Sequence, residues 1–428
     1  MRKRPISLRE VTIGCLLYTF FQLSTSGEEP KTSANILENW RQEFLQCVRN
    51  EALSPNLMVR TMTIFSISVH DALNSAKPRY RTYLEHPDSG IENLNPEAVV
   101  AGCGWTVSQA LHPYNLRGFQ ELSKFARLKD AEKSVKESFL HGQKIASKIL
   151  ANRRGDGAST SISYIATTAP GQWRRTPDFY RPPEKPHWRN VRLWALPDEQ
   201  SFLPPPPPSF HSAEYVSAVS EVKIRGGSNS QLRTPEQSFI AKFWKDFSYT
   251  QTPPGHWNEI ANFVARSLWL DLWEEARLFA LLNLAMSDAG IIAWKAKYKY
   301  HLWRPVDAIR LADEFPSTRK LANHAWSPFL ESPPHPEYPS AHSCFSGAAS
   351  RMLELLTGND RFIFRVSSDQ FKGKYRRFSR FSTCAEEIGK SRLYGGIHFS
   401  FSNENGLNCG RKIGKFTHEN FLQNLQKP

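Results

Sequence analysis

The sequence predicts an all-α fold in which helices pack as bundles. Apolar residues recur at spacings of three and four in several stretches, most clearly over 274–300. Prolines and capping residues stand where helices would begin. Runs that alternate with a period of two, as half-buried strands do, are few, and there is no internal repeat. Helices with one apolar stripe bury it against other helices, so bundles follow.

The first residues have the plan of a secretory signal peptide over 1–26. Arg2, Lys3 and Arg4 give a basic start, residues 11–23 form a mostly apolar run, and residues 24–27 are small enough for cleavage. The run is short for a membrane span. An uncleaved signal anchor or an amphipathic extension is the alternative. We expect a secreted, extracellular protein with one large domain over 27–428.

Capping signals place several helices in the rest of the chain. Ser54-Pro55 predicts an N-cap and a first-turn proline, and Pro96 opens a second helix in the same way. The run 234–237, Thr-Pro-Glu-Gln, is a capping box. Helices are expected over 35–50, 54–74, 96–110, 131–151, from 234, 274–300, 340–356, 384–396 and 407–426.

A long irregular connection is predicted over 158–210. It is rich in proline and aromatic residues and ends in the proline run 204–208. This run favours a stiff spacer between helical halves, with a proline-rich partner ligand as the alternative. Trp173, Trp188 and Trp194 indicate that the connection packs on the core, because disordered linkers are poor in aromatic residues.

Charge and cysteine content restrict the partners. The formal net charge is +14, but there is no dense basic block and no nucleic-acid-binding module, so no nucleic acid partner is expected. A positive field would still draw halide or phosphate toward a binding pocket. Cys15 would leave with the signal, and the odd number of cysteines that remains gives no readable disulfide framework, although one or two bridges are open. The sequence does not indicate an oligomeric state.

Three short motifs in the second half carry groups suited to an oxyanion. In chain order they are Lys297-x6-Arg304-Pro305, Pro339-Ser340-Ala341-His342 and Ser391-Arg392-x5-His398. Arginine forks match the geometry of an oxyanion, and N–H groups at a helix start favour one. One histidine can attack or ligate the central atom while the other moves protons. Each motif is weak alone; together they predict an anion site within 288–412.

The order and spacing of the motifs resemble the signature of a superfamily that contains the vanadium-dependent haloperoxidases and the type 2 phosphatidic acid phosphatases. The flanking runs 170–173, 288–290, 333–338 and 410–412 resemble its soluble haloperoxidase branch. The likeness implies paired four-helix bundles with the anion site inside one of them. The mean hydropathy of −0.49 and the lack of a later run of about 20 apolar residues predict no transmembrane domain, against a membrane lipid phosphatase.

The resemblance also implies a role for each residue of the motifs that would hold the cofactor. Lys297, Arg304 and Arg392 would bind the oxygens of vanadate, or of phosphate in the same site. Ser340 would add a hydroxyl hydrogen bond, and the backbone N–H of Ala341 another.

The histidines take the chemical roles in this resemblance. His398 would bond to vanadium, or attack phosphorus, and His342 would be the general acid–base. His335 stands where the family's halide preference is set, so bromide and iodide are expected over chloride; a turn-capping role is the alternative. Hydrogen peroxide, a halide and a small organic acceptor would be the substrates.

Two residues depart from the family pattern. Ala341 replaces a glycine and adds a methyl group beside the anion. Ser402 stands where the family often has an aspartate, and Glu404 is a nearby candidate to replace that carboxylate. Three functions therefore stay open: a vanadate-dependent haloperoxidase, which is favoured, a phosphatase acting through a phosphohistidine, and a non-catalytic anion-binding relative.

Overall fold

The predicted helices form, and one long helix is shared between two groups of them. The computed structural model describes residues 34–87 and 89–425, so the predicted signal segment and Cys15 lie outside the described residues. The first group consists of α1 (Ala34–Asn50), α2 (Pro55–Ala76), α3 (Pro96–Leu111), α4 (Arg117–Arg127) and α5 (Lys133–Asn152). The second consists of α8 (Thr252–Ser267), α9 (Leu272–Tyr300), α11 (Ala341–Thr357), α12 (Phe381–Tyr394) and α13 (Ser400–Asn420).

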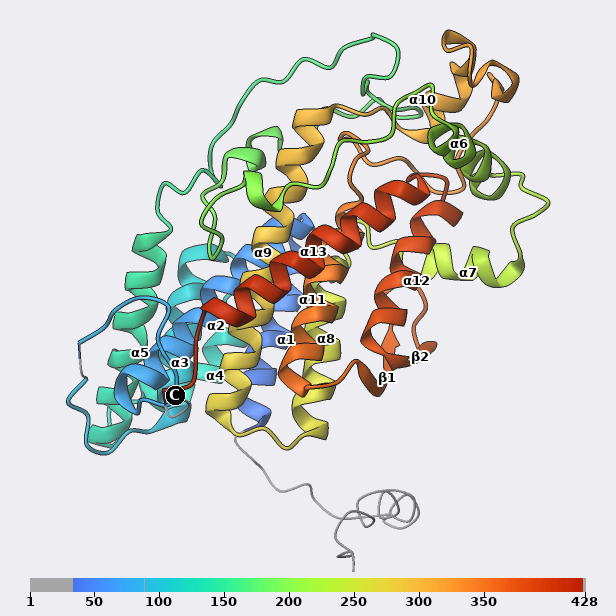
Figure 1. Ribbon diagram of the computed structural model, residues 1–428. Helices are drawn as coiled ribbons and strands as arrows, with labels where there is room; N and C mark the ends of the chain where they lie inside the picture. Colours follow the sequence, from blue (N-terminus) through green and yellow to red (C-terminus); the bar gives the residue numbers. More distant parts are fainter. Residues whose placement is uncertain (1–33, 88, 426–428) are drawn as a thin grey trace, which may run out of the picture. The chain divides into compact units, whose positions relative to one another are not determined.

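The shared helix is α9, which packs against α2 on one side and against α11 and α13 on the other (Figure 1). It begins with a capping box made by Asp271 and Glu274. Its length and composition would allow it to cross a membrane, but 94% of its most apolar window is buried inside the protein. Such burial is typical of a core helix, so α9 is weak evidence for a membrane span.

Helices α11 and α13 lie side by side because glycines remove the side chains between them (Figure 1). A Cβ atom on Gly410 would lie 2.1 Å from the carbonyl oxygen of Cys344, and one on Gly414 would lie 2.6 Å from that of Ala348. Only glycine permits backbones to approach so closely. The helix predicted from residue 407 in fact begins at Ser400.

Shorter elements complete the chain. They are α6 (Ala213–Gly226), α7 (Pro235–Phe243), α10 (Pro305–Arg310), four short 3₁₀ turns and an antiparallel pair of strands, β1 (Arg361–Ser367) and β2 (Tyr375–Arg380). The sequence analysis did not predict α4, α6, α8, α10 or the strand pair. The protein is nevertheless mainly helical, as predicted.

The connection over 158–210 packs on the core, as its tryptophans predicted. Trp173, Trp188 and Trp194 are all buried. The carboxylate of Asp288, on α9, accepts hydrogen bonds from the backbone N–H groups of residues 194–196, at 2.8, 2.8 and 3.0 Å. These bonds fasten the connection to the middle of α9.

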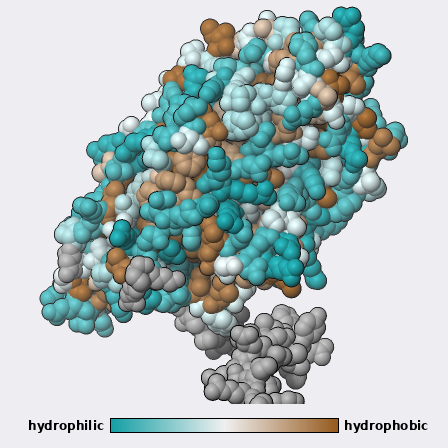
Figure 2. Space-filling view, viewed as in Figure 1, coloured by the Kyte–Doolittle hydropathy of each residue, from teal (hydrophilic) through white to brown (hydrophobic). Residues whose placement is uncertain are grey.

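The face visible in Figure 2 is mostly polar, with apolar residues in small separate groups. The cysteines of the described residues, Cys47, Cys103, Cys344, Cys384 and Cys409, are all buried free thiols. The bridges left open by the sequence therefore do not form among them.

Candidate active site

His398 follows a tight turn between α12 and α13. Gly396, just before it, has a φ of +75°, a backbone conformation that favours glycine. The His398 side chain is buried, and its Nδ1 lies 2.8 Å from the Glu337 carboxylate. An Nδ1–H that donates to this carboxylate leaves the lone pair on Nε2. Nε2 is therefore the atom of His398 that can bind a metal or attack phosphorus.

Glu337 supplies the carboxylate that orients His398. It is fully buried and accepts three hydrogen bonds, from His398 Nδ1, from the N–H of Phe399 at 3.0 Å and from the hydroxyl of Ser402 at 2.6 Å. Burial raises its pKa to about 7, although Ser402, Arg304 and Lys297 oppose the rise. Ser402 thus does not leave His398 without a carboxylate; it helps to hold one.

Glu404 was the candidate for that replacement, and this hypothesis is wrong. The side chain of Glu404 is exposed on α13, whereas the carboxylate that bonds His398 comes from Glu337 in the loop before α11. The sequence analysis quoted Glu337 within a flanking motif but assigned it no role.

Arg304 lies between His398 and His335. Its Nη1 is 3.1 Å from His398 Nε2, its Nη2 is 3.0 Å from His335 Nδ1, and its Nε donates to the His335 carbonyl oxygen at 3.0 Å. Burial lowers its pKa to about 10, so it stays a cation at neutral pH. Arg304 therefore donates to His398 Nε2 and places a positive charge beside it.

His335 has a defined orientation in this site. Because guanidinium groups only donate, His335 Nδ1 accepts from Arg304, and the ring proton is carried on Nε2. The ring packs on Trp294, with 5.1 Å between centroids. Nδ1 also lies 3.1 Å from the Pro336 carbonyl oxygen, but in this tautomer it cannot donate to that oxygen, so a turn-capping role would need the ring proton on Nδ1 instead.

Lys297 holds the loop that carries Glu337 and Ser340. Its ammonium group donates to the carbonyl oxygens of Pro336, Glu337 and Pro339 at 2.9, 2.9 and 2.6 Å. Burial, together with the charge of Arg304, lowers its pKa well below the usual value. All three protons are occupied, so Lys297 must release a carbonyl before it can donate to an anion.

The start of α11 presents free donors, as the motif Pro-Ser-Ala-His predicted. Ser340 is the N-cap residue, and no acceptor among residues 34–87 and 89–425 takes the N–H groups of Ala341 and His342. Unpaired N–H groups at a helix N-terminus favour an anion. The Ser340 hydroxyl has one partner, the Ser343 hydroxyl at 3.2 Å.

Arg392 and His342 form the second cation–histidine pair. Arg392 Nη1 lies 3.4 Å from His342 Nε2, and the same guanidinium donates to the Ser391 hydroxyl and to the carbonyl oxygens of Ala241 and Trp244. Burial lowers the pKa of His342 well below its usual value, and Arg392 adds to the effect. His342 is thus neutral at neutral pH and able to accept a proton.

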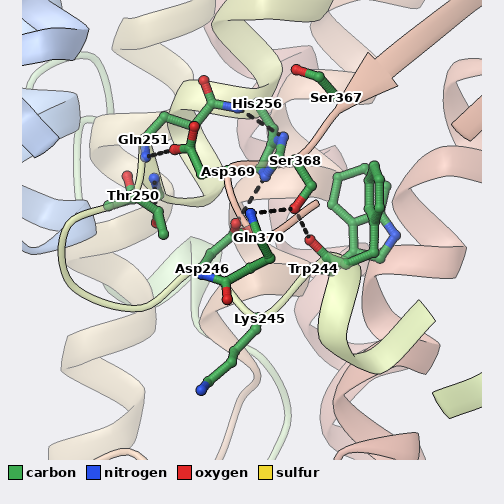
Figure 3. A network of polar contacts seen from close by, with 12 residues as sticks. Trp244, Lys245, Asp246, Thr250, Gln251, His256, Ser367, Ser368, Asp369 and Gln370 are labelled. Carbon is green, nitrogen blue, oxygen red and sulfur yellow. Dashed lines mark hydrogen bonds and ion pairs between the residues drawn. The ribbon is translucent and has the colours of Figure 1, made fainter. Parts of the chain in front are cut away.

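Asp246 is a site residue that no sequence motif indicated. It lies in the loop between α7 and α8, with Oδ2 4.0 Å from His342 Nε2 and Oδ1 2.8 Å from His256 Nε2 (Figure 3). Oδ2 is buried and has no hydrogen-bond donor among the described residues. A protonated His342 would supply that donor.

The predicted residues meet at one cavity of about 340 Å³. His335, Ala341, His342, Arg392 and His398 line it. Lys297, Arg304 and Ser340 are not in its wall but are buried behind it. Asp246 and Glu184 also line the cavity, and neither was predicted. Burial raises the pKa of Glu184, whose carboxylate has no hydrogen bond or ion pair among the described residues.

Another set of potential metal ligands, Cys47, Glu51 and His112, converges in the first helix group. The Glu51 carboxylate already accepts from His112 Nδ1 at 2.9 Å and from the Asn115 amide at 2.6 Å. The Glu51 carboxylate thus links the ends of α1 and α3, while His112 Nε2 is buried without a partner among the described residues.

Comparison with known proteins finds the same helical fold in solved structures and a family match in the half of the chain that holds the site. Residues 277–427 match the family described as the VCPO second helical-bundle domain. The vanadium chloroperoxidase of Curvularia inaequalis is 32% identical over 178 residues, which are 36% of this chain and 29% of that protein. The chain is thus similar to vanadium haloperoxidases, most clearly in its second half. It spans less than a third of the length of that relative.

Solved haloperoxidase structures extend the likeness to nearly the whole chain. A bacterial vanadium-dependent iodoperoxidase superposes with a TM-score of 0.80 at 25% identity, covering 94% of this chain and 100% of its own. A bacterial vanadium-dependent chloroperoxidase in its holo form superposes at 0.68 and 17% identity, covering 86% of this chain and 94% of its own. The second comparison supports the fold alone.

Proposed function

We propose that the protein is a vanadate-dependent haloperoxidase that uses hydrogen peroxide to oxidise halide to hypohalous acid. The observation that carries this proposal is His398, which lines the cavity: Glu337 holds its Nδ1, and Nε2, which accepts from Arg304, is the nitrogen left to bind a metal once Arg304 turns to the anion. Carboxylate–histidine pairs of this kind fix metal-binding histidines in proteins. The likeness to vanadium haloperoxidases supports the same assignment.

The residues present fit vanadate. His398 Nε2 offers one metal-binding atom, and Arg304 and Arg392 offer buried positive charge on either side. The unpaired N–H groups of Ala341 and His342 offer donors for anion oxygens. Lys297 would join them by releasing one of its carbonyl partners. Bound vanadate would supply a Lewis-acidic centre that activates hydrogen peroxide toward halide.

His342 is the proton carrier of the proposed reaction. Halide, hydrogen peroxide and one proton give hypohalous acid and water, so the site must accept a proton from peroxide and deliver protons to the leaving oxygen. A neutral His342 can accept, and its position near Arg392 and Asp246 keeps it at the cavity. We expect His342→Ala to keep its vanadium and to lose ~10²–10⁴-fold in turnover.

We further propose that His335 favours bromide and iodide over chloride. Its Nε2–H lies in the cavity wall and can donate to bound peroxide, whereas a phenyl ring could not. In His335→Phe, chloride turnover should rise relative to bromide turnover. Bromide and chloride rates that are equal in the wild type and unchanged in the variant would exclude this role.

A phosphatase is the second candidate, because His398 Nε2 could equally attack phosphorus in the same pocket. Assays on one preparation decide between the functions. Protein loaded with orthovanadate should consume peroxide only when bromide or iodide is present, and vanadate-free protein should hydrolyse p-nitrophenyl phosphate slowly or not at all. Phosphate ester hydrolysis without halide-dependent peroxide consumption would establish the phosphatase instead. Neither activity, with an anion still bound, would indicate a non-catalytic relative.

A further inference from the structure

Figure 3 shows Asp246, His256 and Gln251 in a chain of polar contacts that the proposed chemistry does not yet use. The chain begins beside His342 and ends at the partly exposed Arg49. Asp246 lies next to His342 and bonds His256 on α8. His256 Nδ1 lies 3.1 Å from the amide nitrogen of Gln251, and the amide oxygen of Gln251 accepts from Arg49 Nη2 at 3.2 Å. Asp246, His256 and Gln251 are all buried.

Arg49 fixes which way the Gln251 amide points. A guanidinium group only donates, so the Gln251 oxygen must face Arg49 and its NH₂ group must face His256. The backbone N–H of Gln251 also donates to Asp369 at 2.7 Å, and Asp369 forms a two-oxygen ion pair with Arg49 at 3.0–3.2 Å. Asp369, in the loop between the two strands, thus bonds both Arg49 and Gln251 and holds them together.

The orientation of Gln251 in turn fixes the tautomer of His256. Because an NH₂ group donates to Nδ1, that nitrogen must be the acceptor, and the ring proton must be on Nε2. Nε2–H then donates to Asp246 Oδ1 at 2.8 Å. The second oxygen of Asp246 has no donor among the described residues and is the one near His342.

We propose that Gln251 is a positioning residue for the proton carrier: oriented by Arg49, it holds His256 in the tautomer that donates to Asp246, and so keeps the other Asp246 oxygen as the acceptor for a proton on His342. The inference rests on the proposed function for its catalytic consequence. The tautomer itself can be tested in protein that contains no vanadate.

The charges around His256 favour a second proton on its ring, and the Gln251 side-chain amide opposes it. Burial lowers the pKa of His256, but the carboxylates of Asp246, Glu259 and Asp369 outweigh burial and raise it. His256 is therefore close to taking a second proton at Nδ1, and the Gln251 NH₂ group opposes this. The charges of Arg392, His256, Lys297 and Arg304 all lower the pKa of His342, and the Asp246 carboxylate lies 4.0 Å from its Nε2.

Gln251→Glu reverses the polarity at Nδ1 with little change of shape. The new carboxylate accepts a hydrogen bond and so favours a proton on Nδ1; His256 then becomes an imidazolium and draws Asp246 into an ion pair. With its charge held on Oδ1, Asp246 accepts more weakly from His342. We expect kcat to fall about tenfold, part of the ~10²–10⁴-fold that a general acid–base contributes. Vanadium content and the KM for halide should stay unchanged.

The direct readout is ¹⁵N NMR of histidine-labelled, vanadate-free protein, with the His256 signals assigned through His256→Gln. Wild-type protein at neutral pH should show Nε2 protonated and Nδ1 bare, and Gln251→Glu should show both protonated. Gln370→Glu is the control, because Gln370 is an exposed neighbour of Asp369 and the variant adds the same charge. It should change neither the His256 signals nor kcat.

Arg49→Gln covers the case in which Gln251→Glu does not fold, because Arg49 is only partly buried. It frees Gln251 to turn, so the two His256 tautomers should mix. A wild-type His256 with its proton on Nδ1, or unchanged His256 signals in the altered proteins, would overturn the proposal. Wild-type protein without peroxidase activity would refute the proposed function and leave the NMR test of the tautomer intact.

Discussion

Replacing Glu337 by glutamine removes the charge behind His398 and almost nothing else. The amide oxygen can still accept from His398 Nδ1 and from the N–H of Phe399, and the amide NH₂ can donate to the Ser402 hydroxyl, which is able to accept. The three contacts of the buried carboxylate are thus retained. What changes is the basicity of His398, because a neutral amide no longer favours positive charge on the ring.

The expected size of the effect follows from these contacts. Loss of a carboxylate partner behind a metal-binding histidine typically weakens metal binding 10–100-fold. Vanadate affinity should therefore fall by ~1.4–2.7 kcal/mol of binding free energy. Unfolding free energy should change little, because the weaker hydrogen bonds of a neutral group are offset by relief of the cost of burying a charge, which the raised pKa of Glu337 records. The Glu337 pKa of about 7 means that part of this charge is already absent at neutral pH, so the loss should be larger at pH 8 than at pH 6.

Equilibrium dialysis against orthovanadate at pH 6 and pH 8 measures this directly. Glu404→Gln is the matched control, since Glu404 is an exposed carboxylate of the same helix that holds Ser402. The control should bind vanadate as the wild type does. If Glu337→Gln binds vanadate with unchanged affinity at both pH values, Glu337 does not tune His398. If Glu404→Gln weakens binding equally, the effect is one of net charge alone.

Three further predictions concern other parts of the chain. Ala341→Gly removes a methyl group from the cavity wall, so vanadate and phosphate should bind severalfold more tightly by calorimetry, while glycine in the first turn of α11 lowers unfolding free energy by about 0.5–1 kcal/mol. Burial raises the pKa of Asp307 from 3.8 to about 7. Ionising this carboxyl group therefore destabilises the folded protein: the loss of stability begins as pH rises above 3.8 and is complete above about pH 7. Asp307→Asn should therefore have an unfolding free energy ~1–4 kcal/mol larger than the wild type at pH 8, and so unfold at a higher temperature there. At pH 4 the two proteins should differ little. The mature amino terminus, sequenced from secreted protein, should lie between Leu23 and Glu28; an intact Met1 on an intracellular protein would contradict the signal peptide.

Local signals in the sequence were sufficient to predict those helices that begin with a capping residue or a first-turn proline. The capping box at Thr234 and the first-turn prolines Pro55 and Pro96 all stand at helix starts in the structure. Helix α4 was missed because its N-cap is Leu116, which makes no side-chain capping bond. The start of α13 was missed because its glycines lower helix propensity, and their value is close packing on α11, a tertiary effect.

The site was predictable where the family motifs name its residues. His398, His342, Arg392, Ala341 and His335 line the cavity, as the motifs imply. Their partners were not predictable, because Asp246 and Glu337 reach the histidines from loops far away in the sequence. Lys297 illustrates a second limit: the motif identified the residue, but only the structure shows that its protons are donated to the Pro336, Glu337 and Pro339 carbonyls.

The central claim is that His398 Nε2 binds vanadium. Vanadium content per chain, measured after loading with orthovanadate and gel filtration, tests it in three proteins. The wild type should retain about one vanadium per chain, His398→Ala should retain none while keeping its helical circular dichroism, and His342→Ala should retain as much as the wild type. Undiminished vanadium in folded His398→Ala would contradict the assignment.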